Sequence, residues 1–257
     1  MNLLIVERHE LAADGRVTLA GARARHLARV LRVTPGQTVR VGLLDGPFGS
    51  ATVIDAADGA VRLHCTFDRE LPERPRVDVL LALPRPKVMR RLWAQLAAIG
   101  VGQIVLTNAS KVERDYFDTH ILHEETYRPL LIEGLQQARD TRLPRVSVHR
   151  QFRVLVEDHL DGLFRGRRLL ADPSATEWPR ARITAQDERV LLAIGPEGGW
   201  NDFERALLAA HGFEAIGVGP RTLRVDTACI ALLAVVHEAL EGRRTCPPSR
   251  DASAGPP

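Results

Sequence analysis

The sequence predicts an α/β protein: a small β-rich domain with one helix, followed by a larger domain built on a mostly parallel sheet. Two observations carry this prediction. Short β-rich runs dominate the chain to about residue 70, and apolar strand-like runs alternate with helix-like runs after the proline-rich, charged segment 69–76. The chain has 257 residues with 45% apolar content, which suits one large domain or two smaller ones.

The first domain, residues 1–72, is expected to be a small barrel. Its β-rich runs are separated by glycine- and proline-containing turns and lie at 39–45, 50–56 and 60–67. The basic segment RARHLARVLR, 23–32, interrupts them and is typical of a helix. The apolar face of this helix would contain Leu27, Val30 and Leu31. Its basic face would contain Arg25, Arg29 and Arg32.

The second domain, residues 75–243, alternates strands and helices, which favours a parallel sheet. Strand-like runs start at 77, 103, 169, 190 and 215. Helix-like runs lie at 89–100, about 124–138, 202–211 and 227–240. Asn201 and Glu204 stand in capping-box positions at the start of the third of these helices. The tail 244–257 has no periodicity and is expected to be disordered.

Composition excludes several classes of protein. The three cysteines form no CxxC pair and the nine histidines show no metal-ligand spacing, so neither a disulfide framework nor a metal site is expected. No apolar run approaches the roughly 18 residues of a membrane span, and the N-terminus becomes charged too early for a secretion signal. A cytoplasmic protein is therefore expected. Of the 35 lysines and arginines, only Lys87 and Lys111 are lysines. A GC-rich genome and selection for phosphate contacts would each produce that bias.

The stretch LLAIGPEGGW, 191–200, is the most informative part of the sequence. VLLAIG, 190–195, lacks polar alternation, as in a strand covered on both faces, and ligands of such sheets bind beyond the carboxyl ends of the strands. Neither GxGxxG nor GxxxxGK[ST] is present, Pro196 removes a backbone donor, and Glu197 puts negative charge where a phosphate would lie. The turn therefore favours a ligand without phosphates, such as S-adenosylmethionine. A tight strand–helix connection without a ligand is the alternative.

A second loop, VGPRTLRVDTA at 218–228, resembles the first. It follows an apolar strand, contains a Gly-Pro pair and opens a helix, so the two loops are expected to form two walls of one ligand pocket. Arg221 and Arg224 would reach a nucleic-acid phosphate or a developing anion. The alternative for both arginines is an ion pair with Glu197 or Asp226.

Together, GPEGGW…E at 195–204 and VGPRTLRVDTA resemble the C-terminal signature of the RsmE-type 16S rRNA (uracil-N3) methyltransferases. HLARVLRVTPGQTV, 26–39, resembles the N-terminal signature of that family's PUA-like barrel. The resemblance covers nearly the whole chain in the same order. It implies a SPOUT-type parallel sheet with a C-terminal trefoil knot, preceded by a PUA-like β-barrel RNA-binding domain. It also implies S-adenosyl-L-methionine as cofactor, 16S rRNA of the small ribosomal subunit as partner, and a homodimer.

The resemblance implies roles for individual residues. The methyl donor would contact Ala193, Ile194, Gly195, Glu197, Gly198, Gly199, Val218, Gly219, Leu223 and Arg224. Arg29 and Arg32 would contact RNA, and the basic runs 23–32 and 84–91 add Arg25, Arg85 and Lys87 as RNA contacts, although a basic run is also typical of a solvated face. Arg224, as stabiliser of a uracil anion or a neighbouring phosphate, and Glu197 are the candidate catalytic residues. Glu197 and Asp226 are candidate general bases by position alone, and the alternative for each is a purely structural role.

Three functions are compatible with the sequence. The first is methylation of uracil N3 in 16S rRNA. The second is methylation of another RNA site, base or ribose 2′-OH, by a divergent paralogue. The third is RNA binding without catalysis. The two intact loops argue against the third, because neither is needed to hold RNA, and the N-terminal barrel favours base methylation.

Overall fold

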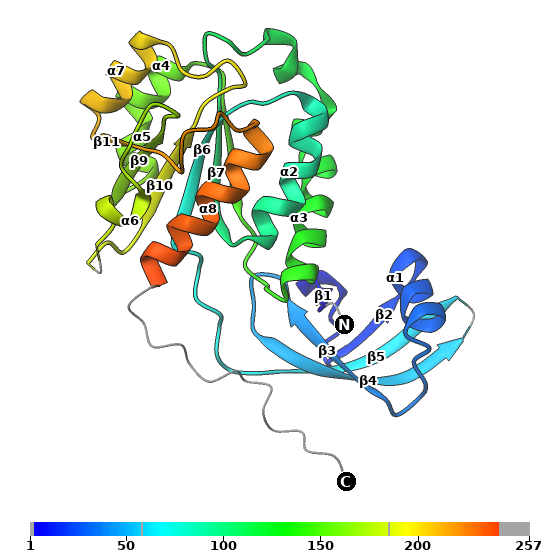
Figure 1. The fold of residues 1–257 in the computed structure, drawn as a ribbon. Helices are drawn as coiled ribbons and strands as arrows, with labels where there is room; N and C mark the ends of the chain where they lie inside the picture. Colours follow the sequence, from blue (N-terminus) through cyan, green and yellow to red (C-terminus); the bar gives the residue numbers. More distant parts are fainter. Residues whose placement is uncertain (1–2, 58, 185, 242–257) are drawn as a thin grey trace.

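The computed structural model describes residues 3–57, 59–184 and 186–241, and these residues form two β-sheets with flanking helices (Figure 1). The smaller sheet belongs to the N-terminal part of the chain, and the larger one begins after the segment 68–76. The expected domain boundaries, 1–72 and 75–243, stay predictions. The expected disordered tail at 244–257 lies outside the described residues.

The N-terminal sheet has five strands in the order β1-β3-β4-β5-β2. They are β1 (Leu4–Val6), β2 (Arg16–Leu19), β3 (Thr38–Leu43), β4 (Phe48–Ala57) and β5 (Ala60–Phe67). β1 and β3 run parallel, and the other neighbours run antiparallel. Buried residues alternate with more exposed ones along β2 and β5, because only one face of these strands meets the core.

The basic segment is helical, but its geometry differs from the expected α-helix. α1 (Gly21–Arg25) continues into a π-helical turn, η2 (His26–Val30), and the Leu31 N–H donates to the carbonyl five residues earlier at 3.1 Å. Each π-helical turn holds an extra residue, which rotates the following side chains relative to an α-helix. Val30 is consequently 66% exposed while Leu27 is buried. Contrary to expectation, Val30 does not share the buried face.

The larger sheet has six parallel strands in the order β11-β9-β10-β6-β7-β8. They are β6 (Val77–Ala82), β7 (Val101–Thr107), β8 (Arg145–His149), β9 (Arg167–Ala171), β10 (Val190–Ile194) and β11 (Phe213–Ile216). All residues of the central strands β6 and β10 are buried, as their continuous apolar runs predict. β8 was not expected. It is a partly buried edge strand, and a strand of this kind does not need a continuous apolar run that could be recognised in the sequence.

Helices pack against this sheet and against each other (Figure 1). They are α2 (Pro86–Ala98), α3 (Glu124–Ala138), α4 (Phe152–Val154), α5 (Leu160–Leu163), α6 (Pro179–Arg182), α7 (Asp202–Ala210) and α8 (Val225–Glu241). α8 contacts β6 and β10, α2 contacts β7 and α8, and α3 packs on α2. The four expected helices correspond to α2, α3, α7 and α8. α4, α5 and α6 were not expected, because segments this short show no helical periodicity.

The predicted α/β fold with a parallel sheet is confirmed, whereas the trefoil knot stays a prediction. Within 3–57, 59–184 and 186–241, no helix combines the length and the apolar character needed to span a membrane. In the same residues no group of three or more His, Cys, Asp or Glu side chains is placed to hold a metal ion.

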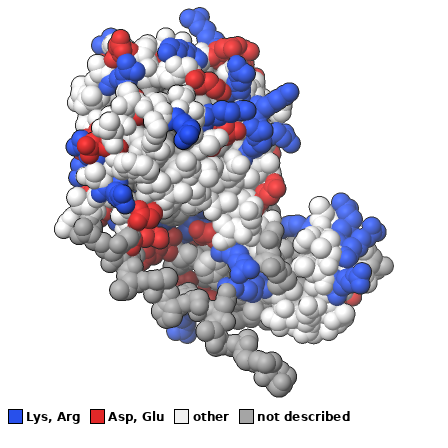
Figure 2. All heavy atoms as spheres, in the orientation of Figure 1, with Lys and Arg blue, Asp and Glu red and all other residues white. Residues whose placement is uncertain are grey.

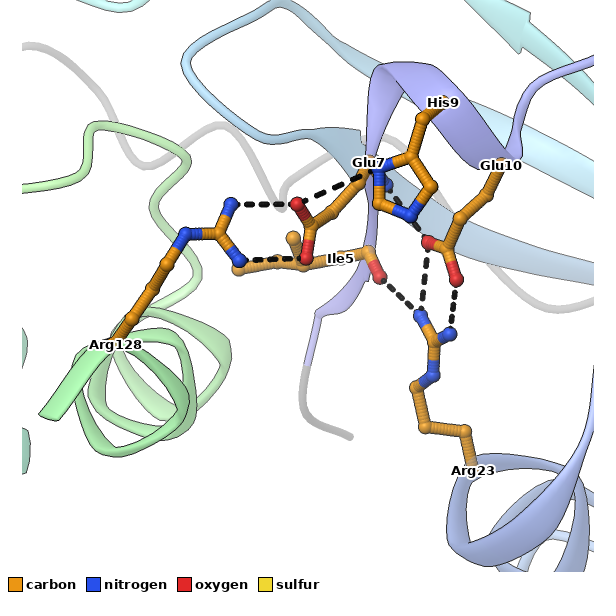
Figure 3. A network of polar contacts seen from close by, with 6 residues as sticks. All are labelled: Ile5, Glu7, His9, Glu10, Arg23 and Arg128. Atoms are coloured by element: carbon orange, nitrogen blue, oxygen red, sulfur yellow. Dashed lines mark hydrogen bonds and ion pairs between the residues drawn. The ribbon is translucent and has the colours of Figure 1, made fainter. Parts of the chain in front are cut away.

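A series of charged side chains links the two parts of the molecule (Figure 3). Arg128 of α3 donates to both carboxylate oxygens of Glu7, with 2.9 Å between Nη1 and Oε1. The Glu7 N–H donates to Glu10 at 2.9 Å, and Glu10 forms an ion pair with Arg23 of α1. Arg23 also donates to the Ile5 carbonyl at 3.3 Å. The larger domain is thereby connected to the basic helical segment of the smaller one.

These contacts keep both carboxylates charged. The hydrogen bond from Arg128 lowers the pKa of Glu7 below its ordinary value. Burial by itself raises the pKa of Glu10, but the hydrogen bonds from Arg23 and from the Glu7 N–H outweigh it, so the pKa of Glu10 is also lowered. A carboxylate whose pKa is lowered by folding stabilises the fold above its unfolded-state pKa and loses that contribution as the pH falls through the lowered value.

The first prediction concerns this link. Arg128→Met should lower the free energy of unfolding by about 1–2 kcal/mol at pH 7, because Glu7 loses a two-bond charged partner. The difference from wild type should shrink as the pH falls below 4.5, the ordinary pKa of Glu7, towards its lowered folded value. Arg153→Met is the control, since Arg153 pairs with Glu157 on an exposed surface and should change stability by less than about 0.5 kcal/mol. Equal, pH-independent effects of both variants would contradict the account.

Candidate active site

A cavity of about 340 Å³ lies at the carboxyl-terminal edge of the larger sheet. Three strands that are neighbours in the sheet supply its walls: β10 leads into the 195–199 turn, β11 into the 217–224 loop, and β9 into the 172–175 loop. Val225, Ala228 and Leu232 of α8 add an apolar wall. We call it the strand-end cavity. Its place agrees with the rule that ligands of parallel sheets bind beyond the strand ends.

Most of the predicted donor-binding residues line this one cavity. They are Ile194, Gly195, Glu197, Gly198, Gly199, Val218, Gly219 and Leu223. The two loops singled out in the sequence therefore do face each other. Two of the predicted residues lie elsewhere. Ala193 is fully buried inside β10, with Leu80 and Leu170 as its strand neighbours, and Arg224 borders a different cavity.

The sequence prediction missed a third wall and a lysine. Ala171, Asp172 and Pro173, at the end of β9, line the strand-end cavity together with Lys111, which follows β7. The apolar run before Asp172 had identified a strand end. What sequence reasoning lacked was the strand order, which places β9 between β10 and β11.

Glycines in the 195–199 turn allow close contacts with neighbouring side chains. A Cβ atom on Gly195 would lie 3.0 Å from the Trp200 ring, and one on Gly198 would lie 2.7 Å from Lys111 Cδ. Gly199 has a φ of +70°, a conformation that other residues rarely adopt. These glycines therefore allow close packing around the cavity.

The predicted capping box after the turn is confirmed. The Asn201 side chain accepts from the Glu204 N–H and the Glu204 side chain accepts from the Asn201 N–H, each at 2.8 Å. Glu204 is 3% exposed and also accepts from the Ser110 N–H at 2.6 Å. A single buried carboxylate thus holds together the start of α7, the end of the 195–199 turn and the loop after β7.

A second cavity of about 270 Å³ adjoins the first and shares Glu197 and Val225 with it. We call it the adjoining cavity. Its remaining lining residues are Arg85, Val88, Arg224 and Asp226. The Arg85 N–H donates to Glu197 Oε1 at 3.3 Å. Two predicted RNA-binding or catalytic arginines and a predicted catalytic carboxylate therefore meet at one place.

Of the two predicted partners for Arg224, the structure supports Asp226, but weakly. Arg224 Nε lies 3.8 Å from the Asp226 carboxylate, and the Arg224 side chain is 77% exposed. Asp226 accepts a shorter hydrogen bond, 2.9 Å, from Arg91. An exposed pair at that separation contributes little energy. The Arg224 guanidinium is therefore available to a ligand in the adjoining cavity.

The predicted RNA contacts are exposed. They are Arg25, Arg29, Arg32, Arg85 and Lys87. Figure 2 shows Lys and Arg side chains gathered over the α1 region of the smaller domain and over one side of the larger domain. Arg32 ends the helical segment with a φ of +50°, a conformation that is uncommon for a residue other than glycine. Exposure and charge fit RNA binding, whose energy comes largely from phosphate contacts.

A parallel sheet with a cavity beyond its strand ends, next to a smaller β-sheet, is typical of a ligand-binding α/β protein. Comparison with known proteins identifies the family. A model of the RNA methyltransferase domain matches residues 72–237, and a model of the RNA methyltransferase PUA domain matches residues 19–64. The first match covers more than half of the chain. The protein belongs to the RsmE-type family of RNA methyltransferases.

Relatives and solved structures agree with this. Ribosomal RNA small subunit methyltransferase E of Treponema pallidum is 30% identical over 92% of this chain and 90% of its own length, and the Synechocystis sp. protein of the same name is 29% identical over 92% and 78%. A probable rRNA-methyltransferase from Porphyromonas gingivalis superposes with a TM-score of 0.75 at 21% identity, covering 95% of this chain and all of its own. Ribosomal RNA small subunit methyltransferase E from Neisseria gonorrhoeae, bound to S-adenosyl methionine, gives 0.71 at 20% identity, covering 90% and 95%. These structures share the fold.

The second prediction tests how the loops close the strand-end cavity. A Cβ on Gly217 would lie 2.4 Å from the Ala175 carbonyl oxygen, which is backbone and cannot swing away. Gly217→Ala should therefore destabilise the protein by about 1–3 kcal/mol in denaturant unfolding. Gly162→Ala is the matched control, because its Cβ meets no atom within 4 Å and alanine favours a helix. If both variants were as stable as wild type, the close approach of the two loops would be wrong.

Proposed function

We propose that this protein transfers the methyl group of S-adenosyl-L-methionine to N3 of a uridine in 16S rRNA of the small ribosomal subunit. The observation that carries the proposal is the strand-end cavity, which brings both predicted loops together beside a second, arginine-lined cavity. Membership of the RsmE-type family supports it, as do relatives named ribosomal RNA small subunit methyltransferase E and a similar structure bound to S-adenosyl methionine.

The strand-end cavity fits such a donor. Its volume is adequate for a small molecule, and its walls combine apolar side chains with glycine backbone. Trp200 is 5% exposed and lines the cavity, and among the described residues its indole N–H has no hydrogen-bond partner. Glu197 and Asp172 supply negative charge beside a ligand that carries a sulfonium cation.

The adjoining cavity is proposed to receive the target base. Uracil N3 is paired in duplex RNA, so the base must be unpaired before it can react. When bound, the donor supplies an electrophilic methyl group. Loss of the N3 proton creates a uracil anion, which the Arg224 guanidinium is proposed to stabilise. Glu197 is better placed than Asp226 to accept the proton, because it borders both cavities while Asp226 is bound to Arg91.

The basic helical segment of the smaller domain is proposed to hold the RNA. Arg25, Arg29 and Arg32 are exposed on it, and phosphate contacts would orient the substrate without reading its sequence. By family resemblance we further propose a homodimer with RNA near the subunit boundary, a C-terminal trefoil knot around the donor site, and action in the cytoplasm on the small subunit.

The third prediction tests the reaction itself. Small ribosomal subunits that lack the modification should gain one methyl group per 16S rRNA when incubated with the protein and S-adenosylmethionine. Mass spectrometry of the nucleosides should identify 3-methyluridine. A ribose-methylated nucleoside would instead identify a divergent 2′-O-methyltransferase. Donor binding without any methylated product would favour the third function, RNA binding without catalysis.

The fourth prediction separates the two arginine groups. Arg224→Ala should lower kcat by about 10²–10³-fold, the range found when an oxyanion donor is removed, while donor affinity changes little. Arg29→Ala should instead raise KM for the ribosomal substrate. It should also reduce the slope of log RNA affinity against log salt concentration by about one unit. Single-turnover rates and RNA affinities at several salt concentrations would measure both. Undiminished turnover by Arg224→Ala would remove Arg224 from the mechanism.

A further inference from the structure

Lys111 occupies an unusual place for a cation in this protein. It is one of only two lysines in the chain, and it lies in the loop between β7 and η3 (Arg114–Asp118). Its Nζ donates to the Gly198 carbonyl at 2.6 Å, in the middle of the 195–199 turn. The side chain lines the strand-end cavity, although the loop that carries it lies more than 80 residues before the turn in the sequence.

The loop that carries Lys111 is held in place by two backbone hydrogen bonds to other parts of the larger domain. The Ser110 N–H donates to the buried Glu204 carboxylate at 2.6 Å, and the Asn108 N–H donates to the His149 carbonyl at 3.3 Å. The lysine chain then runs across Gly198, where a Cβ would lie 2.7 Å from Lys111 Cδ. Glycine at 198 thus leaves room for the lysine, and the ammonium group is fixed at the cavity wall.

The Lys111 ammonium group keeps part of its hydrogen-bonding capacity. A lysine has three N–H donors, and its partner here is a neutral carbonyl. Among the described residues no carboxylate lies within ion-pair distance of Lys111. Two arginines also line the cavity. Arg205 pairs with Asp202 and donates to the Trp200 carbonyl, whereas Arg221 is exposed and forms no ion pair with a described residue. Lys111 differs from Arg221 because a hydrogen bond to the Gly198 carbonyl holds its ammonium group at the 195–199 turn. Lys111 is therefore positioned for an anionic group of a ligand.

Charges around the cavity are arranged for a ligand that carries both signs. Asp172 lines the cavity as well, and although burial raises its pKa, the hydrogen bonds from Ser174 outweigh burial and lower it, so Asp172 is charged. Lys111 contributes the opposite charge. The proposed donor carries a sulfonium, an amino group and one anionic group, the α-carboxylate of its amino-acid tail.

We propose that Lys111 binds the α-carboxylate of the methyl donor and makes the site selective for donors that retain that group. This inference rests on the proposed function. It explains why a lysine approaches a turn whose own sequence offers no cation, and why the turn carries glycine at 198. The position of Lys111 within the strand-end cavity, rather than the adjoining one, favours the donor over an RNA phosphate.

The fifth prediction uses two donors that differ by the carboxylate alone. Calorimetry in the absence of RNA would measure the Kd of S-adenosylmethionine and of decarboxylated S-adenosylmethionine for the full chain. Wild type should prefer the carboxylated donor. Lys111→Gln should raise the Kd of S-adenosylmethionine about fivefold to tenfold, as expected for a lost hydrogen bond to a charged group at an exposed site. The Kd of the decarboxylated donor should not change. Lys111→Arg should restore part of the preference.

The controls keep the outcomes distinct. Arg40→Gln removes an exposed cation from β3 and should not alter either Kd. If Lys111→Gln raised the Kd of both donors equally, Lys111 would only support the turn. If neither Kd changed, Lys111 would not contact the donor. Each of these results would overturn the proposal. Loss of RNA affinity with the donor preference intact would assign Lys111 to a phosphate instead. If wild type bound neither donor, the proposed function itself would fail.

Discussion

The carboxyl ends of β9, β10 and β11 meet at one edge of a parallel sheet, and the ligand cavity exists because of that arrangement. The carboxyl ends of parallel strands all lie at the same edge of the sheet, so the three loops that follow these strands lie close together. Glycine makes the approach possible: the backbone at Gly217 lies where a Cβ would be 2.4 Å from the Ala175 carbonyl oxygen. Close approach of the backbone at Gly217 therefore contributes to the shape of the cavity.

A second constraint fixes the chemistry at this edge. Glu204 is a buried carboxylate whose partners are backbone N–H groups from α7 and from the loop after β7. Buried charged groups need such partners, so the loop cannot move away without exposing the carboxylate. The same loop carries Lys111 to the 195–199 turn, and the same turn places Glu197 between the two cavities. The capping carboxylate of α7 thus helps to position Lys111 and Glu197 at the site.

Much of this site was predictable from the sequence, since its signals are local. An apolar run ending in glycine gave β10 and its turn, and Asn201 with Glu204 gave the cap of α7. Lys111 and Asp172 were not predictable, because their places depend on the order of strands in the sheet. Val30 was assigned to the wrong face, because a π-helical turn leaves no signature in a single sequence. For Arg224 the sequence identified the correct loop, but it did not show that the residue borders the adjoining cavity instead of the strand-end cavity.

A crystal structure of the protein with S-adenosylhomocysteine, the demethylated product of the donor, would show directly whether the donor binds between the strand-end loops. The ligand should lie between the 195–199 turn and the 217–224 loop, with its sulfur facing the adjoining cavity that contains Arg224. A ligand bound outside the three strand-end loops, or with its sulfur turned away from Arg224, would contradict this arrangement.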